Sequence, residues 1–111
     1  MEKYAIRIAE EFSDKPGGRW RDLGSNSGEE FYEDILLPKF DEARKDGEKL
    51  YIYLDGAKSY PNSFLDQSFG ELGRKYGKDI VADTIIFKTV GFLWIVKYIK
   101  EEIWQIGRAH V

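Results

Sequence analysis

The chain has 111 residues, a formal net charge of −3 and no cysteine. Its length suits one folded domain over residues 1–111, and its 42% of hydrophobic residues suffices for a core, which excludes intrinsic disorder. The negative charge argues against nucleic-acid binding, and the absence of cysteine, of a targeting segment and of a long apolar run predicts a cytoplasmic protein with no disulfides and no membrane attachment.

Two strands are expected near the start of the chain. Apolar residues alternate with others from Tyr4 to Ile8, which predicts a strand over residues 3–10. A Pro-Gly-Gly turn follows, and Trp20 then stands between two arginines, so a second strand near residues 18–22 would complete an antiparallel hairpin. Trp20 is expected to cover the core.

A helix is predicted over residues 28–45. Ser27 and Glu30 have the spacing of a capping box, in which the serine hydroxyl accepts from the backbone N–H three residues on. Several carboxylates follow in the first turns, where negative charge is favourable, so they need no catalytic role. Pro38 has no N–H to donate and is expected to kink the helix or to mark a restart.

Strands and helices alternate in the rest of the chain. The apolar run of residues 49–55 predicts a central strand that is covered on both faces. A helix is expected over 63–76, a strand over 84–90 and a last helix over 92–106. Because strands joined by helices usually run parallel, the sequence predicts a small α/β domain with a mixed sheet of about four strands and three helices packed on it.

The helix over residues 63–76 is expected to cover the sheet with its apolar stripe. The predicted contacts join Leu65, Phe69 and Leu72 of this helix to Ile52, Leu54 and Ile86 of the strands. Gly70 and Gly73 lie inside the helix and lack the Gly-Lys-Ser/Thr pattern of a phosphate loop. They are expected to let the helix approach the sheet or a partner closely.

No set of residues is typical of a catalytic centre. His110 is the one histidine and stands next to the last residue, in a segment expected to be frayed, where it cannot be held as a general base. The sequence therefore predicts no enzyme, no cofactor and no metal site. A metal-dependent enzyme stays open as an alternative, because Asp55 and Asp66 could approach one another and bind Mg²⁺.

Two motifs carry a family resemblance. They are Asp55-Gly56 with Tyr60 and Ser63-Phe64-Leu65 before Phe69-Gly70, and, earlier in the chain, Ser27-Gly28-Glu29-Glu30-Phe31. On these residues the chain resembles the STAS-like family of unknown function, over roughly residues 19–90. The resemblance implies a STAS-like α/β fold.

That family is similar in turn to the STAS domains of anti-sigma-factor antagonists, in which a kinase-like ATPase phosphorylates a serine at the start of a helix and so breaks the complex. When the motifs are aligned through Gly56 and Leu65, this serine falls at Ser63. The resemblance thus implies a partner-switching component with Ser63 as the phosphorylation site. The chain differs from these antagonists because it lacks the aspartate before the serine and the glycine after it.

The favoured hypothesis is a non-enzymatic regulatory module that binds a protein partner through the loop and helix start around Ser63. The candidate contact residues are Asp55, Gly56, Tyr60, Asn62 and Phe64. Both aromatic rings could instead belong to the core, and Ser63 could act with Asp66 only as a helix cap. The alternative function is the binding of a small anion or nucleotide at the N-terminus of the same helix.

Overall fold

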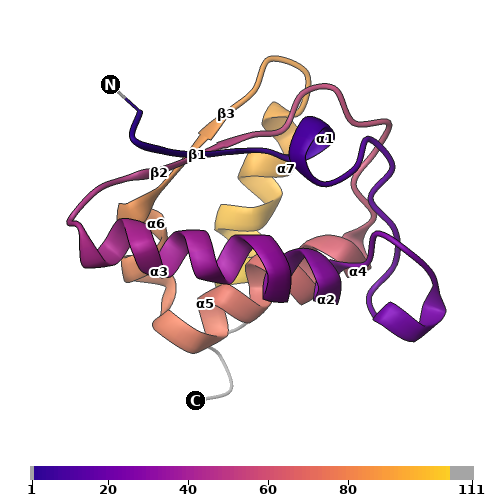
Figure 1. Cartoon of the computed structure of the whole chain (residues 1–111), viewed down its shortest axis with the longest axis horizontal. Coiled ribbons are helices and arrows are strands. Elements are labelled where there is room, and N and C mark those ends of the chain that lie inside the picture. The colour runs from indigo at the N-terminus through magenta and orange to yellow at the C-terminus, as the bar shows by residue number, and fades with distance from the viewer. Residues whose placement is uncertain (1, 106–111) are drawn as a thin grey trace.

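The computed structural model describes residues 2–105, in which three parallel strands lie side by side (Figure 1). The strands β1 (Tyr4–Arg7), β2 (Leu50–Tyr53) and β3 (Ile85–Lys88) are arranged in the order β1-β2-β3. This order confirms the prediction that residues 49–55 form the central strand. All pairing is parallel, so the predicted mixed sheet with a fourth strand is wrong for this part of the chain.

The first strand is shorter than expected. β1 ends at Arg7, and the single-turn helix α1 (Ile8–Glu11) follows, although a strand was predicted as far as residue 10. The carboxylate of Glu11 accepts from the backbone N–H of Arg7 at 2.9 Å. This bond satisfies a free donor at the start of the turn, which favours the helical turn over a longer strand.

The segment that was expected to form the second strand instead closes the N-terminus of a helix. The backbone N–H of Gly28 donates to the carbonyl of Gly18 at 2.8 Å, and that of Glu29 donates to the carbonyl of Arg19 at 3.0 Å. The first N–H groups of a helix have no partner within it and need such acceptors. The segment therefore caps a helix and does not pair with β1.

Arg21 fixes the rest of this segment to the acidic first turns of the helix. It begins a 3-10 turn, Arg21–Leu23, and its side chain donates to Glu33 at 3.2 Å and to Asp34 at 2.9 Å. The turn points away from the sheet, and Trp20 is 44% exposed. The prediction that Trp20 covers the core is therefore wrong.

The first long helix follows the prediction closely. It comprises α2 (Gly28–Phe31), a π-helical turn and α3 (Leu37–Lys45) without interruption. The Ser27 hydroxyl accepts from the N–H of Glu30 at 3.0 Å, as the capping box requires. Pro38 lies in the first turn of α3, where the hydrogen-bonding pattern changes from π to α, so the helix runs on through the proline.

The second long helix comprises α4 (Asn62–Leu65), a π-helical turn and α5 (Glu71–Tyr76). Gly77, at a φ of 89°, ends it, and the short helix α6 (Lys78–Thr84) leads into β3. The sequence analysis did not predict α6, whose seven residues are too few for a clear apolar period.

The last helix begins at Leu93 with α7 (Leu93–Tyr98) and continues through a π-helical turn that ends at Ile103. The predicted helix end at Ile106 and the tail with His110 lie outside the described residues. Within residues 2–105, no helix is long and apolar enough to cross a membrane.

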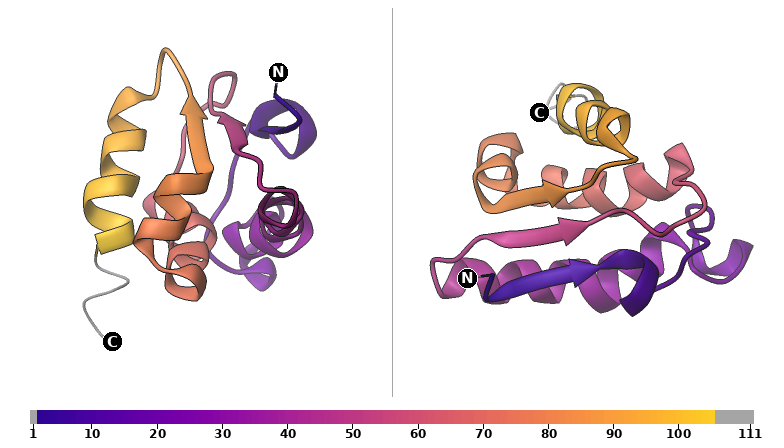
Figure 2. Two further views of the ribbon diagram at one scale, coloured as in Figure 1. Left: turned by 90° about the vertical axis from the view of Figure 1, so that its left-hand side faces the viewer. Right: turned by 90° about the horizontal axis from the view of Figure 1, so that it is seen from above.

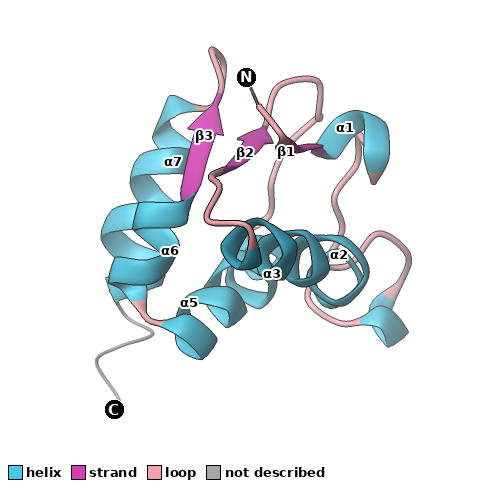
Figure 3. Ribbon diagram, turned by 60° about the vertical axis from the view of Figure 1, so that its left-hand side comes forward, coloured by secondary structure: helices cyan, strands magenta, loops and turns pink. Residues whose placement is uncertain are grey.

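The helices α3 and α5 lie on one side of the sheet, and α7 runs alongside the β3 edge (Figures 2 and 3). The fully buried residues that meet there include Ile6, Leu50, Ile52, Leu54, Leu65, Phe69 and Leu72. The ring of Phe69 contacts that of Phe87 edge-on, with 5.4 Å between centroids. Ile86 points to the opposite face, so the predicted contact of the helix with Ile86 is wrong by one residue of strand register.

The other face of the sheet has no helix over it. Leu50 and Ile52 face the core, whereas Tyr51 and Tyr53 alternate with them and are half-buried. The prediction that this strand is covered on both faces is therefore wrong. Tyrosine counts as apolar in a sequence pattern because its ring is large. Its hydroxyl group nevertheless reaches solvent or a polar partner, so a strand rich in tyrosine need not be buried on both faces.

Candidate functional site

The loops that follow β2 and β3 meet at the carboxyl edge of the sheet, and Asp55 joins them. Its carboxylate accepts from the Thr89 hydroxyl at 2.7 Å, from the N–H of Val90 at 2.7 Å and from the N–H of Gly91 at 3.0 Å. These bonds, that from Val90 foremost, lower the pKa of Asp55. Asp55 thus holds the β3–α7 loop as an ionised acceptor.

A second set of contacts extends this link to α7. The Thr89 hydroxyl oxygen accepts from the N–H of Phe92 at 2.9 Å. The Phe92 ring meets the ring of Tyr60 edge-on at 5.0 Å, and the Tyr60 hydroxyl donates to the carbonyl of Leu54 at 2.7 Å. Burial raises the pKa of Tyr60, so this phenol stays a donor. The two loops therefore form one braced unit.

This braced unit leaves three large apolar side chains in solvent. Val90 is 87% exposed, Leu93 66% and Trp94 61%. We call these three residues the apolar corner. The sequence analysis did not predict this corner, although the sequence contains a signal for it. The run from Val90 to Ile95 is almost entirely apolar, and a helix buries only one stripe, so some of these residues must be exposed.

The helix start at Ser63 differs from the prediction. The helix begins at Asn62, Pro61 occupies the N-cap position, and no side chain caps the helix. Ser63 is therefore the second residue of the first turn, half-buried, and the alternative that Ser63 caps this helix is wrong. The fixed φ of Pro61 suits the entry to a helix and makes a serine cap unnecessary.

Tyr60 and Phe64, the predicted aromatic contact residues, lie in the core. Phe64 is fully buried and stacks on Phe31 with 5.6 Å between ring centroids. Tyr60 is 3% exposed. Neither ring can be an exposed anchor in this conformation, whereas Asn62 and Gly56 are exposed. The interpretation of both rings as core, which the sequence left open, describes this structure.

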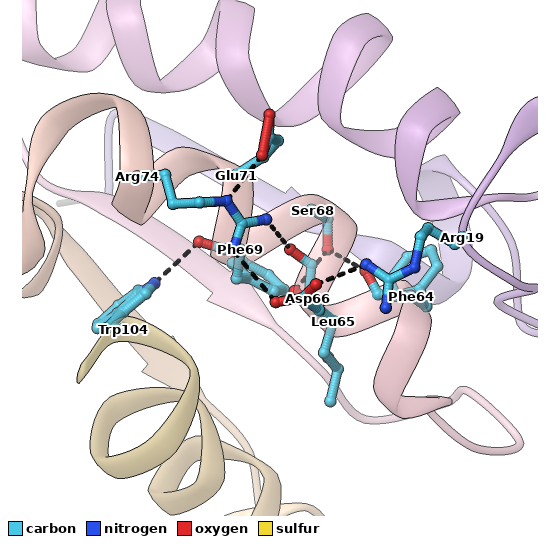
Figure 4. Close-up of polar contacts among 9 residues, drawn as sticks. All are labelled: Arg19, Phe64, Leu65, Asp66, Ser68, Phe69, Glu71, Arg74 and Trp104. Carbon is cyan, nitrogen blue, oxygen red and sulfur yellow. Dashed lines mark hydrogen bonds and ion pairs between the residues drawn. The ribbon is translucent and has the colours of Figure 1, made fainter. Parts of the chain in front are cut away.

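Asp66 lies in an ion-pair network between Arg19 and Arg74 (Figure 4). Arg19 donates to its carboxylate at 2.5 Å and Arg74 at 3.2 Å. Burial alone would raise the pKa of Asp66, but the hydrogen bonds from the two arginines outweigh burial and lower it. Asp66 thereby ties the segment around Arg19 to α5.

The predicted alternative of a metal site formed by Asp55 and Asp66 finds no support in this geometry. Each carboxylate is engaged by its own hydrogen-bond donors, which belong to different parts of the fold. Among residues 2–105 no group of three or more carboxylate or histidine side chains is placed to hold a metal ion. The two acids therefore have structural partners that account for them.

Gly70 and Gly73 allow a close approach between the second long helix and the last one. A Cβ at Gly73 would lie 2.7 Å from Cδ1 of Trp104, and one at Gly70 would lie 3.2 Å from Ile103. The Trp104 indole N–H donates to the carbonyl of Phe69 at 3.0 Å. The glycines thus allow a close approach, as the sequence predicted, but the neighbour is the last helix and not the expected sheet or partner.

The sequence matches the family described as a STAS-like domain of unknown function (DUF4325) over residues 27–91. The chain belongs to this STAS-like family. The match confirms the resemblance expected from the two motifs. Neither the curated proteins nor the solved structures gave a match.

The matched part of this STAS-like domain begins at the Ser27 cap and ends at Gly91 in the β3–α7 loop. It includes Asp55 and Ser63, and thus both sides of the braced unit. Trp94 lies beyond the match. The matched segment therefore contains the residues that form the braced unit, apart from Phe92. Two of the three residues of the apolar corner, Leu93 and Trp94, follow it.

Proposed function

We propose that this STAS-like domain is a non-enzymatic regulatory module that binds a protein partner through the apolar corner. One observation carries the proposal: three large apolar side chains are exposed on the β3–α7 loop, which Asp55 holds by three hydrogen bonds, and on the first turn of α7 that follows it. Exposed anchors on a rigid support are typical of binding hot spots, because little conformational entropy is lost when a partner packs on them.

The proposed partner is a kinase-like ATPase, with Ser63 as the residue it phosphorylates. Ser63 lies in the first turn of its helix and does not cap it, so its hydroxyl is not needed to start the helix. A phosphate adds roughly −1.5 to −2 charges, which the N-terminal turn of a helix accommodates well. Phosphorylation would therefore leave the domain folded while it adds charge three residues after Tyr60, whose ring contacts Phe92 before α7.

The contact surface can be tested with immobilised chain and an extract of the native host. We expect Trp94→Ser to reduce the amount of each specifically retained protein about tenfold, equivalent to about 1.4 kcal/mol. Trp20→Ser is the matched control, since Trp20 is also an exposed tryptophan but lies directly before the 3-10 turn. Equal retention by wild type and Trp94→Ser would contradict the proposed surface.

The switch can be tested separately with the purified kinase-like ATPase and ATP. Mass spectrometry should find a phosphate on the peptide that contains Ser63. Ser63→Asp should weaken partner binding about tenfold, whereas Ser63→Ala should bind like the wild type. If the three forms bind alike and no phosphate is found, the switch is wrong. A nucleotide that raises the Tm of the chain alone would instead favour the small-ligand alternative.

A further inference from the structure

The face of the sheet that no helix covers has a definite composition. We call it the open face; it comprises Ala5, Arg7, Tyr51, Tyr53, Ile86 and Lys88, which alternate with the core residues. Figure 2 (right) looks onto the strands from this side, with α3 and α5 behind them. The register places Tyr51 between Ala5 and Ile86 in one row across the sheet. The next row is Arg7, Tyr53 and Lys88.

An uncovered face is unusual for a parallel sheet. Parallel sheets occur almost only with a layer of helices on each face, because their strands are apolar on both. Here the row of Ala5, Tyr51 and Ile86 is half-buried, and no helix lies in front of the strands in Figure 2 (right). The architecture thus leaves room for one more helical layer.

The charges of the open face indicate what that layer carries. The Arg7 guanidinium lies over the Tyr53 ring, 4.3 Å from its centroid, and the Lys88 ammonium lies 5.7 Å from the centroid of Tyr51. Within residues 2–105 neither cation makes an ion pair with a carboxylate. Glu2 accepts from the Tyr53 hydroxyl at 2.5 Å. Two cations thus flank the central strand and can receive carboxylates from outside.

We propose that the open face is the docking site of an amphipathic helix of a partner protein, with acidic side chains on both sides of its apolar stripe. Three strands of four residues each form a face about 10 Å wide, given a strand spacing of about 4.8 Å, and a helix has a similar diameter. The apolar stripe covers Tyr51 and Ile86, and the acidic side chains pair with Arg7 and Lys88.

Two other occupants fit less well. A second copy placed face to face would bring two Arg7 and two Lys88 side chains into one interface, and like charges there are costly. The face is also much smaller than the roughly 800 Å² per partner of a standard stable interface. A single-stranded nucleic acid would be repelled by the net charge of −3, and the apolar row offers it no cation.

The test uses the whole chain and a display library of helical peptides of about 18 residues, with a fixed leucine stripe and random flanking positions. We expect the enriched peptides to carry Asp or Glu beside the stripe. Arg7→Gln with Lys88→Gln should weaken their binding about tenfold, and Arg7→Glu with Lys88→Glu should reverse the charge preference. Lys100→Glu, an exposed change on the last helix, is the matched control, and each variant's Tm is measured to confirm folding.

Several results would overturn the proposal. These are peptides with basic flanks, peptides indifferent to Arg7 and Lys88, and no enrichment at all. Binding of an oligothymidylate that depends on Arg7 and Lys88 would assign the face to nucleic acid, and sedimentation showing a dimer that Tyr51→Ser dissolves would assign it to a second copy. Since Trp94→Ser should leave peptide binding unchanged, failure here is distinct from failure of the proposed function.

Discussion

Asp55 illustrates how an exposed residue acquires a structural role from hydrogen bonds alone. It holds three donors of the β3–α7 loop, and its pKa is lowered because these donors favour the charged form. The residue was singled out in the sequence as a partner contact or a metal ligand. Its position at the end of the central strand therefore indicated that Asp55 has a role. It did not identify the partners, which lie more than thirty residues away in the sequence.

Asp55→Asn should destabilise the chain at neutral pH and not at acidic pH. A group with a lowered pKa contributes stability above its unfolded pKa, about 3.9 for aspartate, and loses the contribution as the pH falls through the folded pKa. Urea unfolding of wild type and variant from pH 7 down to acid would measure the difference. A difference in the free energy of unfolding that does not change with pH would contradict this role for the carboxylate.

The two serines at helix starts should differ in their effect on stability. Ser27→Ala removes a cap that accepts from the N–H of Glu30, and should cost about 1 kcal/mol. Ser63→Ala removes no cap and should cost less than about 0.5 kcal/mol. Urea unfolding of both variants compares them directly. Equal losses would mean that Ser63 caps the helix in solution.

At the scale of elements, the second long helix is held between the sheet and the last helix. Phe69 meets Phe87 of β3 and is fully buried. Phe69→Ala should therefore cost about 3 to 5 kcal/mol, as large aromatic truncations in a core do. Ile86→Ala is the control, because Ile86 lies on the open face, and about 1 kcal/mol is expected. Chemical denaturation measures both. A larger loss in the free energy of unfolding for Ile86→Ala than for Phe69→Ala would mean that Ile86 faces the core, as the sequence predicted.

The contact between this helix and the last one should be sensitive to a single methyl group. Gly73→Ala places a Cβ 2.7 Å from Trp104 and should cost about 1 to 3 kcal/mol through overpacking. Gly18→Ala has no atom within 4 Å of the new Cβ and serves as the control, with a change within about 0.5 kcal/mol. Thermal unfolding would compare them; no loss for Gly73→Ala would show that the helices separate readily.

At the scale of the whole molecule, β2 has hydrogen-bonded neighbours on both sides, β1 and β3. We expect its amides to exchange with solvent only when the whole chain unfolds, because no local opening frees a central strand. The amides of residues 17–26 should exchange faster, since the segment is held by a few caps and surface ion pairs. Native-state hydrogen exchange tests this order, and slower exchange in residues 17–26 than in β2 would contradict it.

Much of this molecule follows from its sequence alone. The capping box at Ser27 and the helix with Phe69 were predicted with nearly their observed bounds, and the central strand after Lys49 was predicted in the right place but three residues too long. These features depend on neighbours along the chain, within the period of a helix or strand, so local spacing is sufficient to identify them. The STAS-like motifs were also recognised in the sequence, and the family match confirms the resemblance.

Only the tertiary structure decided how these elements use their surfaces. The arginines of residues 19–21 pair with carboxylates of two helices, so a segment with the pattern of a strand becomes a cap. The apolar corner arises because Asp55 draws the β3–α7 loop across the sheet edge. The open face arises because the two long helices that connect the strands both pack on the other side. Each outcome depends on partners distant in sequence, and periodicity carries no information about which of two apolar surfaces meets another element.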